Sequence, residues 1–187
     1  MRSRWVLLGF GCAALAGCGN ARTPPPDLAT ARPPTAFARQ VFPSAGVRLR
    51  APGNWQVQPG SPPLVVAVRS GLASVAVWRY PRDARLPASK AQLRTALRRL
   101  VARVRSRDAT FVLESAGVVA VARRGAVQLR GLETIDGQRR EVRSTHLYAH
   151  GAEVVIDAYA PPDQFRTVDR RVFHPLLRGL RLQAPTA

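Results

Sequence analysis

Hydrophobic positions follow a period of two through the first half of the chain. Val47 to Arg50 alternates apolar and basic residues, and the runs Leu64 to Val68 and Ser74 to Tyr80 are rich in residues that favour strands. Turn-forming residues separate these runs, at Pro52-Gly53-Asn54 and at Ser70-Gly71. The pattern therefore predicts short strands, with a hairpin or tight connection between the second and third runs.

A helical period replaces this alternation from Ser89 to Arg107. Ser89 is a good N-cap, and Gln92 three residues later predicts a capping box, in which two side chains satisfy free backbone N–H groups. One face carries aliphatic residues at helical spacing: Leu93, Leu97, Leu100, Val101 and Val104. Arginines fill much of the remaining surface. We expect the helix to pack on a sheet with its charges in water, and a helix lying on a membrane surface is the alternative.

The second half of the chain returns to strands. Phe111 to Leu113 and Val118 to Ala122 read as strands, and Arg123-Arg124-Gly125 is expected to turn the chain. Asp136-Gly137 predicts a type I′ hairpin, because both positions tolerate a positive φ. The remaining runs of this antiparallel meander are 126–135, 138–149 and 153–159.

A second helical stripe follows Pro161-Pro162. Its apolar positions are Phe165, Val168, Val172, Leu176, Leu177 and Leu180. Pro175 lacks the N–H that a helix would use at this point, so we expect a kink or two short helices. Either form would cover the sheet.

These elements predict one α+β domain over residues 37–182, an antiparallel β-sheet flanked by helices as an α/β/α-type sandwich. Residues 183–187 form a short tail. Residues 18–36 include Pro24-Pro25-Pro26 and Pro33-Pro34, and this composition predicts a semi-rigid spacer of polyproline type. No segment after Leu15 is long and apolar enough to span a bilayer.

The N-terminus has the order of an export signal over residues 1–17. Arg2 and Arg4 give it a positive start, and the apolar run from Trp5 to Leu15 leads into small residues. The last four positions, Leu15-Ala16-Gly17-Cys18, resemble the lipobox of bacterial lipoproteins. That resemblance implies that the Cys18 thiol receives a diacylglyceryl group, that cleavage leaves Cys18 first in the mature chain, and that acyl chains such as palmitate anchor it.

An ordinary signal peptide with an incidental cysteine is the alternative at the N-terminus. Cys12 also follows a glycine, but Gly9 stands where the lipobox has an aliphatic residue, so Cys12 is the weaker candidate. With the lipobox interpretation we expect attachment to the extracytoplasmic face of the cell membrane, or to the outer membrane in a cell with two membranes.

Charge changes this picture in one respect. The net charge of +18 falls to +16 when Arg2 and Arg4 leave with the signal, and Lys90 is the only lysine. Export argues against a nucleic-acid partner, and a bias towards arginine codons in a GC-rich genome explains a solvated basic surface. The sharper alternative is attraction to anionic lipid or envelope polymer. Its contacts would be the helix arginines Arg94, Arg98 and Arg105.

Candidate catalytic groups are few. Both cysteines lie in the signal region, so the mature domain holds no disulfide. His146 and His150 have the spacing of a zinc pair on a helix, but four residues of strand span about 13 Å, so we expect no shared metal and no cofactor.

Ser144, His146 and Asp157 could form a hydrolase triad, since the first two share one side of a strand and the third lies on its neighbour. No Gly-x-Ser-x-Gly turn presents this serine, and we expect no enzyme. Cross-strand ion pairs with arginine explain the carboxylates of this region better than acid–base chemistry. They are Glu133, Glu141, Glu153 and Asp157.

Four aromatic residues leave two interpretations open. Trp55, Trp78, Tyr80 and Tyr159 could line an apolar pocket or belong to the core and its rim. A small domain with few aromatics needs them in its core, and the core is the default.

The order of elements resembles the PsbP/Mog1-like group, which includes small bacterial lipoproteins. A turn at Pro52-Gly53-Asn54-Trp55, the basic helix, the long meander and the closing stretch Leu177 to Leu182 carry the likeness. It implies an antiparallel sheet between helical layers and action by binding partners, with no shared catalytic motif. We therefore expect a lipid-anchored, non-catalytic binding module at the cell envelope. An arginine-rich surface for anionic lipid or polymer, and an unrecognised hydrolase, are the alternatives.

Overall fold

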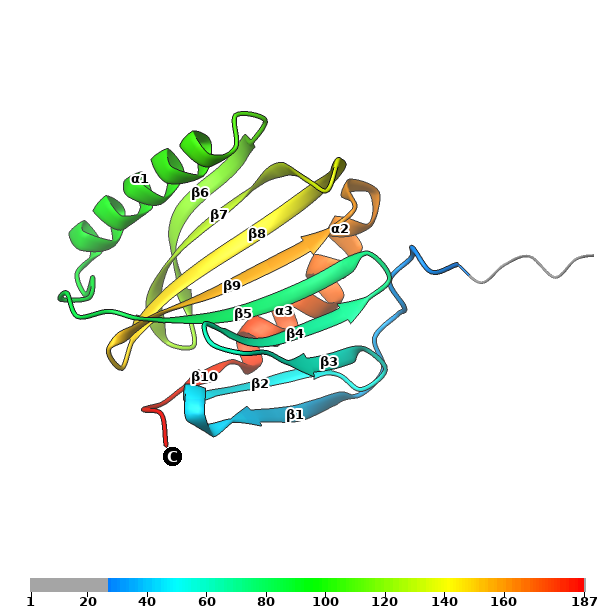
Figure 1. Ribbon diagram of the computed structural model, residues 1–187, viewed down its shortest axis with the longest axis horizontal. Coiled ribbons are helices and arrows are strands. Elements are labelled where there is room, and N and C mark those ends of the chain that lie inside the picture. The colour runs from blue at the N-terminus through cyan, green and yellow to red at the C-terminus, as the bar shows by residue number, and fades with distance from the viewer. Residues whose placement is uncertain (1–26, 187) are drawn as a thin grey trace, which may run out of the picture.

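A computed structural model describes residues 27–186, and two antiparallel sheets form its frame (Figure 1). The larger sheet has seven strands in the order β3-β4-β5-β9-β8-β7-β6. They are β3 (Gln56–Pro59), β4 (Leu64–Ser70), β5 (Ala73–Pro81), β9 (Ala152–Ala160), β8 (Gln138–Ala149), β7 (Arg124–Ile135) and β6 (Val112–Val121). The smaller sheet has the order β1-β2-β10, from β1 (Phe37–Phe42), β2 (Val47–Pro52) and β10 (Arg181–Leu182). A short 3₁₀ turn, η1 (Pro43–Ala45), joins β1 to β2.

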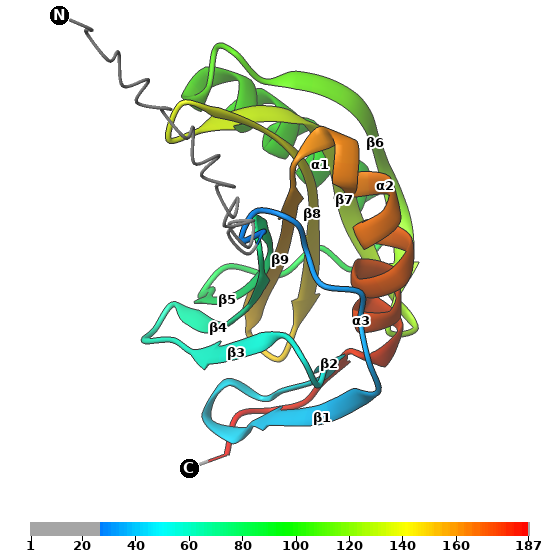
Figure 2. The same cartoon turned by 90° about the vertical axis from the view of Figure 1, so that its right-hand side faces the viewer.

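Helices cover the large sheet on both faces. α1 (Lys90–Arg107) lies over β6 and β7 on one face. α2 (Pro162–Val168), the π-helical turn η2 (Asp169–Phe173) and α3 (His174–Gly179) follow one another on the other face, where α2 contacts β8 and β9 (Figure 2). The predicted α+β fold, an antiparallel sheet between helical layers, is confirmed.

The capping box predicted for α1 is present. The Ser89 hydroxyl accepts a hydrogen bond from the Gln92 N–H at 3.2 Å, and the Gln92 side chain accepts from the Ser89 N–H at 3.0 Å. Of the predicted apolar stripe, Leu93 and Val104 are fully buried, whereas Leu97, Leu100 and Val101 are half-buried. The helix packs on the sheet and its arginines are exposed to solvent, as the first of the two interpretations has it.

The core is divided by the large sheet. Most buried side chains lie on the face of α2 and α3, where they also meet the small sheet, and Phe165 and Phe173 stack edge to face at 5.8 Å. A smaller cluster lies under α1 and comprises Val104, Phe111, Leu129 and Val142. The two faces of the sheet are therefore packed very unequally.

Three type I′-like turns connect the long strands. Asp136 and Gly137 have φ of 49° and 72°, so the predicted hairpin is confirmed. The turn expected at Arg123-Arg124-Gly125 is wrong by one to two residues, because Ala122 and Arg123 take the positive φ values of 51° and 61°. Gly125 already lies within β7, close to the Leu93 side chain, where a Cβ would collide. Close packing, and not turn geometry, explains this glycine.

The closing stretch forms two short α-helices, one of the two forms predicted from Pro175, and helical dihedral angles continue through the turn between them. Pro175 is the second residue of α3, and the turn before it is π-helical, so two short helices follow one another through η2. None of the helices within residues 27–186 combines the length and apolar character needed to cross a bilayer.

Residues 27–36, which the sequence places in the spacer, lie along the domain. Ala29 accepts a hydrogen bond from the Leu72 N–H at 2.9 Å, and Arg32 accepts one from the Trp55 indole at 3.0 Å. This part of the predicted spacer therefore packs on the domain and does not stand free. The signal (1–17), Cys12, Cys18 and the rest of the spacer lie outside the described residues, and the predicted domain boundaries remain predictions.

Candidate functional site

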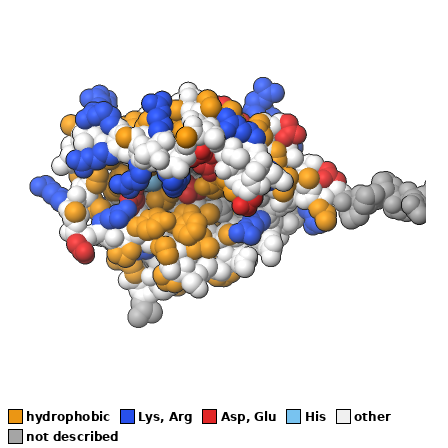
Figure 3. Space-filling model, turned by 45° about the horizontal axis from the view of Figure 1, so that its top comes forward, with side chains coloured by type: hydrophobic (Ala, Val, Ile, Leu, Met, Phe, Trp, Pro, Cys, Tyr) orange, Lys and Arg blue, Asp and Glu red, His pale blue; other side chains and the backbone are white. Residues whose placement is uncertain are grey.

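A cavity of about 360 Å³ lies between α1 and the large sheet, and we call it the α1 cavity. Its apolar wall is built by both layers, with Leu100 and Val104 from the helix and Leu129, Val142 and Val155 from the strands. Figure 3 shows this face, with hydrophobic side chains gathered in a hollow and charged side chains of both signs at its edge. Its polar lining residues are Tyr80, Arg82, Arg103, Arg107, Glu133, Ser144, His146, Glu153, Asp157 and Tyr159.

Strand pairing gathers the polar groups on this face. In the β8–β9 register Ser144 lies opposite Asp157 and Tyr148 lies opposite Glu153, so alternate residues of both strands point towards α1. The Ser144 hydroxyl lies 3.0 Å from His146 Nε2 and donates to Asp157 Oδ1 at 2.6 Å. His146 Nδ1 lies 2.7 Å from Glu153 Oε1. The result is one continuous chain of polar contacts from Glu153 to Asp157.

The carboxylates of the cavity experience opposite environments. The hydrogen bond from His146 is the main reason that the pKa of Glu153 falls to about 2, and Arg82 adds to it. Burial instead raises the pKa values of Asp157 and Glu133 above the usual carboxyl range. Within residues 27–186 neither Asp157 nor Glu133 forms an ion pair. The Arg107 charge opposes this effect at both groups, and the Ser144 hydrogen bond and His146 also oppose it at Asp157, but burial dominates. The two carboxyl groups are thus desolvated without a directly paired cation.

The three residues of the imagined triad do come together, but in a different arrangement. Glu153, and not Asp157, contacts the histidine nitrogen that faces away from the serine, which is where a triad has its acidic residue. Asp157 instead accepts a hydrogen bond directly from the Ser144 hydroxyl. Ser144 is in mid-strand, paired with Leu129 on one side and Asp157 on the other, so no strained turn presents it.

The sequence predicts a cross-strand ion pair between Glu153 and an arginine. Glu153 does pair with Arg82, and its second oxygen contacts His146. The contact with His146 could not be predicted without the exact position of the β8–β9 turn. His150 and Gly151 form this turn, with φ of 50° and 68°, and the resulting register brings Glu153 to the face of His146.

His146 and His150 do not form a pair. His146 is buried on β8 with Ser144 and Glu153 as neighbours, whereas His150 is exposed in the β8–β9 turn. Among residues 27–186 no three His, Cys, Asp or Glu side chains are placed to share a metal ion.

Both interpretations of the aromatic residues hold for different members. Trp55 is 4% exposed and belongs to the core. Tyr80 and Tyr159 line the α1 cavity, and burial is the main reason that the pKa of Tyr159 is raised. Tyr159 also packs against the small core cluster under α1, so for this residue both interpretations hold.

The helix arginines proposed as anionic-surface contacts lie away from the cavity. Arg94, Arg98 and Arg105 are exposed, and Arg98 donates to the Thr95 hydroxyl at 3.1 Å. Arg103 and Arg107, on the same helix, line the cavity instead.

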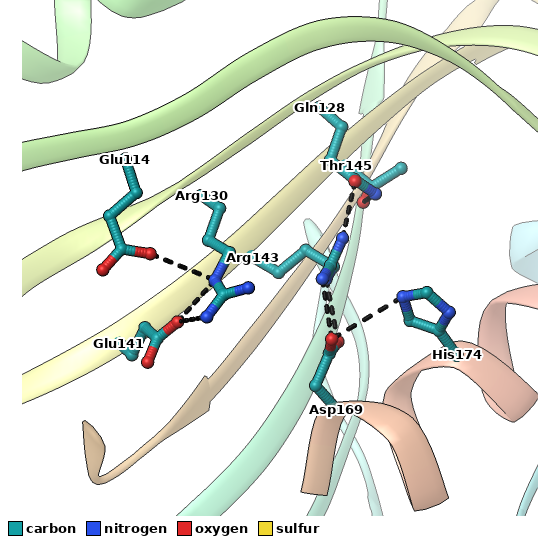
Figure 4. A network of polar contacts seen from close by, with 8 residues as sticks. All are labelled: Glu114, Gln128, Arg130, Glu141, Arg143, Thr145, Asp169 and His174. Carbon is teal, nitrogen blue, oxygen red and sulfur yellow. Dashed lines mark hydrogen bonds and ion pairs between the residues drawn. The ribbon is translucent and has the colours of Figure 1, made fainter. Parts of the chain in front are cut away.

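A second polar network lies on the opposite face of the sheet (Figure 4). Arg143 donates two hydrogen bonds to Asp169, at 2.8 and 2.7 Å, and a third to Gln128 at 2.7 Å. Gln128 donates in turn to the Thr145 hydroxyl at 2.8 Å. This network ties η2 to β7 and β8 and leaves its buried polar groups satisfied, which is the role of a structural clamp.

Beside the clamp, Arg130 contacts Glu114 and Glu141, and its guanidinium lies 4.9 Å from the Phe165 ring centre. Burial raises the pKa of Glu141, and the Arg130 side chain opposes that effect. These contacts also join the sheet to α2.

Comparisons with known proteins support the fold. No family model matches the chain, and no curated protein matches it in sequence. Cyanobacterial PsbP (CyanoP) from Synechocystis is similar in structure, with a TM-score of 0.60, 13% identity, and coverage of 91% of this chain and 100% of that one.

Two further solved structures share the architecture. LpqN of Mycobacterium tuberculosis, described as involved in cell envelope biogenesis, has a TM-score of 0.53 at 15% identity, covering 79% of this chain and 91% of its own. The yeast Ran-binding protein Mog1p has a TM-score of 0.52 at 8% identity, covering 80% and 96%. At these identities the likeness shows a PsbP/Mog1-like fold, as the sequence resemblance implied, and the fold alone.

Proposed function

We propose that this protein is a lipid-anchored, extracytoplasmic binding module that holds its ligand in the α1 cavity. The lipobox-like end of the signal supports the anchor, and the similarity to an envelope protein fits the location. Cys18 is nine positions before Asp27, where the described domain begins, and a chain of that length reaches about 30 Å. The domain would therefore stay close to the membrane surface.

The unpaired carboxyl groups of Asp157 and Glu133 carry the binding proposal. A carboxylate removed from water is costly unless a cation approaches it. An ammonium or guanidinium group entering the cavity would offset that cost, and the aliphatic wall with Tyr80 and Tyr159 would cover an apolar part of the same ligand. The ligand class that fits is thus a molecule or protein segment with an apolar body and a cationic group.

Acyl labelling tests the anchor. In cells fed a labelled fatty acid, the wild-type chain is expected to carry label and to sediment with membranes, and Cys18→Ala is expected to lose both. Cys12→Ala is the matched control and should keep both. An unlabelled, soluble wild-type protein would refute the lipid anchor.

Filling the cavity tests the binding role. Leu100 lines the cavity from α1, whereas Leu97 is half-buried on the same helix and does not line it. In cross-linking within native membranes, Leu100→Trp should capture several-fold less partner than wild type, while Leu97→Trp should capture the same amount. Equal capture by both variants would place the ligand elsewhere.

The Ser144–His146–Glu153 contacts favour a hydrolase as a second candidate. A reactive serine would label with a fluorophosphonate probe, and Ser144→Ala would abolish that label. We expect no labelling, because the Ser144 hydroxyl donates to Asp157 and Ser144 lies in mid-strand, where no turn presents it as a nucleophile.

The exposed arginines of α1 remain the proposed contacts of the other alternative, an anionic lipid or polymer. Replacing Arg94, Arg98 and Arg105 with Gln should then weaken envelope binding steeply with salt. Cavity binding predicts no change from this triple substitution.

A further inference from the structure

A groove lined by arginines lies on the small sheet, where β1 and β2 meet α3 and β10. Five arginines line it, together with Leu49 and Pro175, and the groove is open to solvent with a volume of about 700 Å³. We call it the arginine groove and define it by Arg39, Arg48, Arg50, Arg178 and Arg181. None of its lining residues lines the α1 cavity, and none of them belongs to α1.

Like charges face each other across this sheet. Arg39 is the register partner of Arg50 in the β1–β2 pair, and Arg181 is the register partner of Arg48 in the β10–β2 pair. Arg48 and Arg50 are two residues apart on β2, so the four side chains share one face. Like charges directly opposite each other destabilise a sheet. The arrangement therefore costs stability unless something anionic lies between them.

No Asp or Glu stands in the strands and the helix that line this groove. Residues 28–82, which contain β1 and β2, hold no Asp or Glu, and neither do residues 170–187, which contain α3 and β10. Within the described part of the chain, none of the five arginines forms an ion pair. Two acid-free stretches, far apart in the sequence, are thus paired through β2 and β10.

Neutral oxygens hold three of the five side chains in place. Arg48 donates to the Gln183 side chain, Arg50 donates to the Phe37 carbonyl at 2.9 Å, and Arg181 donates to the Leu180 carbonyl at 2.7 Å. These bonds orient the guanidinium groups and leave their charge uncompensated. A positioned cation loses less freedom when a ligand binds, which favours binding.

We propose that the arginine groove binds a ligand that carries two or more phosphoryl groups. Guanidinium groups match phosphate oxygens in planar, two-point contacts, and a cluster of five requires more than one negative charge to balance it. The same chemistry is offered by a soluble oligophosphate and by the headgroups of an anionic membrane. This second site is independent of the ligand of the α1 cavity.

Isothermal titration of the full chain with tripolyphosphate tests the soluble source. Sedimentation with phosphatidylglycerol vesicles, compared with phosphatidylcholine vesicles, tests the headgroup source. The triple variant Arg39→Gln, Arg50→Gln, Arg178→Gln should weaken binding about tenfold or more. Arg94→Gln, Arg98→Gln, Arg105→Gln removes the same charge from α1 and should change it less than about twofold.

The outcomes separate cleanly. Groove-dependent binding of tripolyphosphate supports the site with a soluble ligand, and groove-dependent binding of anionic vesicles alone supports it with a lipid headgroup. Equal weakening by the two triple variants would reduce the effect to net charge and overturn the proposal. Absence of binding to both probes would also overturn it. Circular dichroism of both variants shows whether the fold is kept.

Discussion

The two faces of the large sheet treat buried charge in opposite ways. On the face of α2 and α3, Arg143 and Asp169 form a two-point ion pair, and Gln128 and Thr145 complete the hydrogen bonds around it. On the face of α1, Asp157 and Glu133 have no ion pair within residues 27–186 and border a cavity. Successive residues of β8 point to opposite faces. The face to which a polar side chain points, and not its residue type, therefore decides whether it joins the structural network or the cavity.

This difference teaches how to interpret a polar group in the sheet. A charge whose partners are all supplied by the chain stabilises the fold, and its removal should cost stability alone. A buried charge without a partner destabilises the fold. Such a charge indicates a functional site, because a ligand of opposite charge would remove the destabilisation. Three predictions challenge this distinction, from the largest effect to the smallest.

Breaking the clamp should have the largest effect. Asp169→Asn leaves the half-buried Arg143 without its counter-charge, and the free energy of unfolding should fall by about 3–5 kcal/mol. Asp163→Asn, an exposed position on α2, is the matched control and should change it by less than about 0.5 kcal/mol. Urea unfolding followed by circular dichroism measures both. A loss below about 1 kcal/mol for Asp169→Asn would contradict the stabilising role of the Arg143–Asp169 ion pair.

Acid should act on the α1 face through Glu153. Its pKa is lowered to about 2 in the folded protein from an ordinary value of 4.5, so the stability it contributes is present above pH 4.5 and is lost as the pH falls towards 2. The unfolding free energy of the wild type should fall by about 2–3 kcal/mol more than that of Glu153→Gln over this range. Parallel pH profiles for the two proteins would contradict the prediction.

Asp157→Asn should have the smallest effect, and of opposite sign. Burial raises the pKa of Asp157, so its ionised form destabilises the fold as the pH rises above the ordinary carboxyl range. Asn keeps an acceptor for Ser144 without the charge, and at pH 7 we expect a gain of up to about 1 kcal/mol. The gain should vanish below about pH 4. A loss at pH 7 comparable to that of Asp169→Asn would erase the difference between the faces.

Much of the fold was predictable from local patterns. Ser89 with Gln92, Asp136-Gly137 and Pro175 each act within a few residues, and each has the predicted effect. The turn at Ala122-Arg123 was missed because neither residue that takes a positive φ is a glycine. Gly125, two positions later, was the glycine from which the turn was predicted. The spacer residues 27–36 were missed in part because their contacts with Leu72 and Trp55 are distant in sequence.

The candidate site was harder to predict, since it depends on register. The alternation of β8 placed Ser144 and His146 together, but the meeting of His146 with Glu153 required the position of the β8–β9 turn. The arginine groove required the pairing of β2 with a two-residue strand at the other end of the chain. No local pattern announces a contact of that kind.

The central claim is that the ligand binds on the α1 face and not on the clamp face. A photoreactive phenylalanine analogue at Tyr80, which lines the α1 cavity, and the same analogue at the exposed His174 of α3 compare the two faces in one experiment. In native membranes we expect a discrete cross-linked product from position 80 that is lost in Leu100→Trp, and none from position 174. A product from position 174, with none from position 80, would contradict the claim.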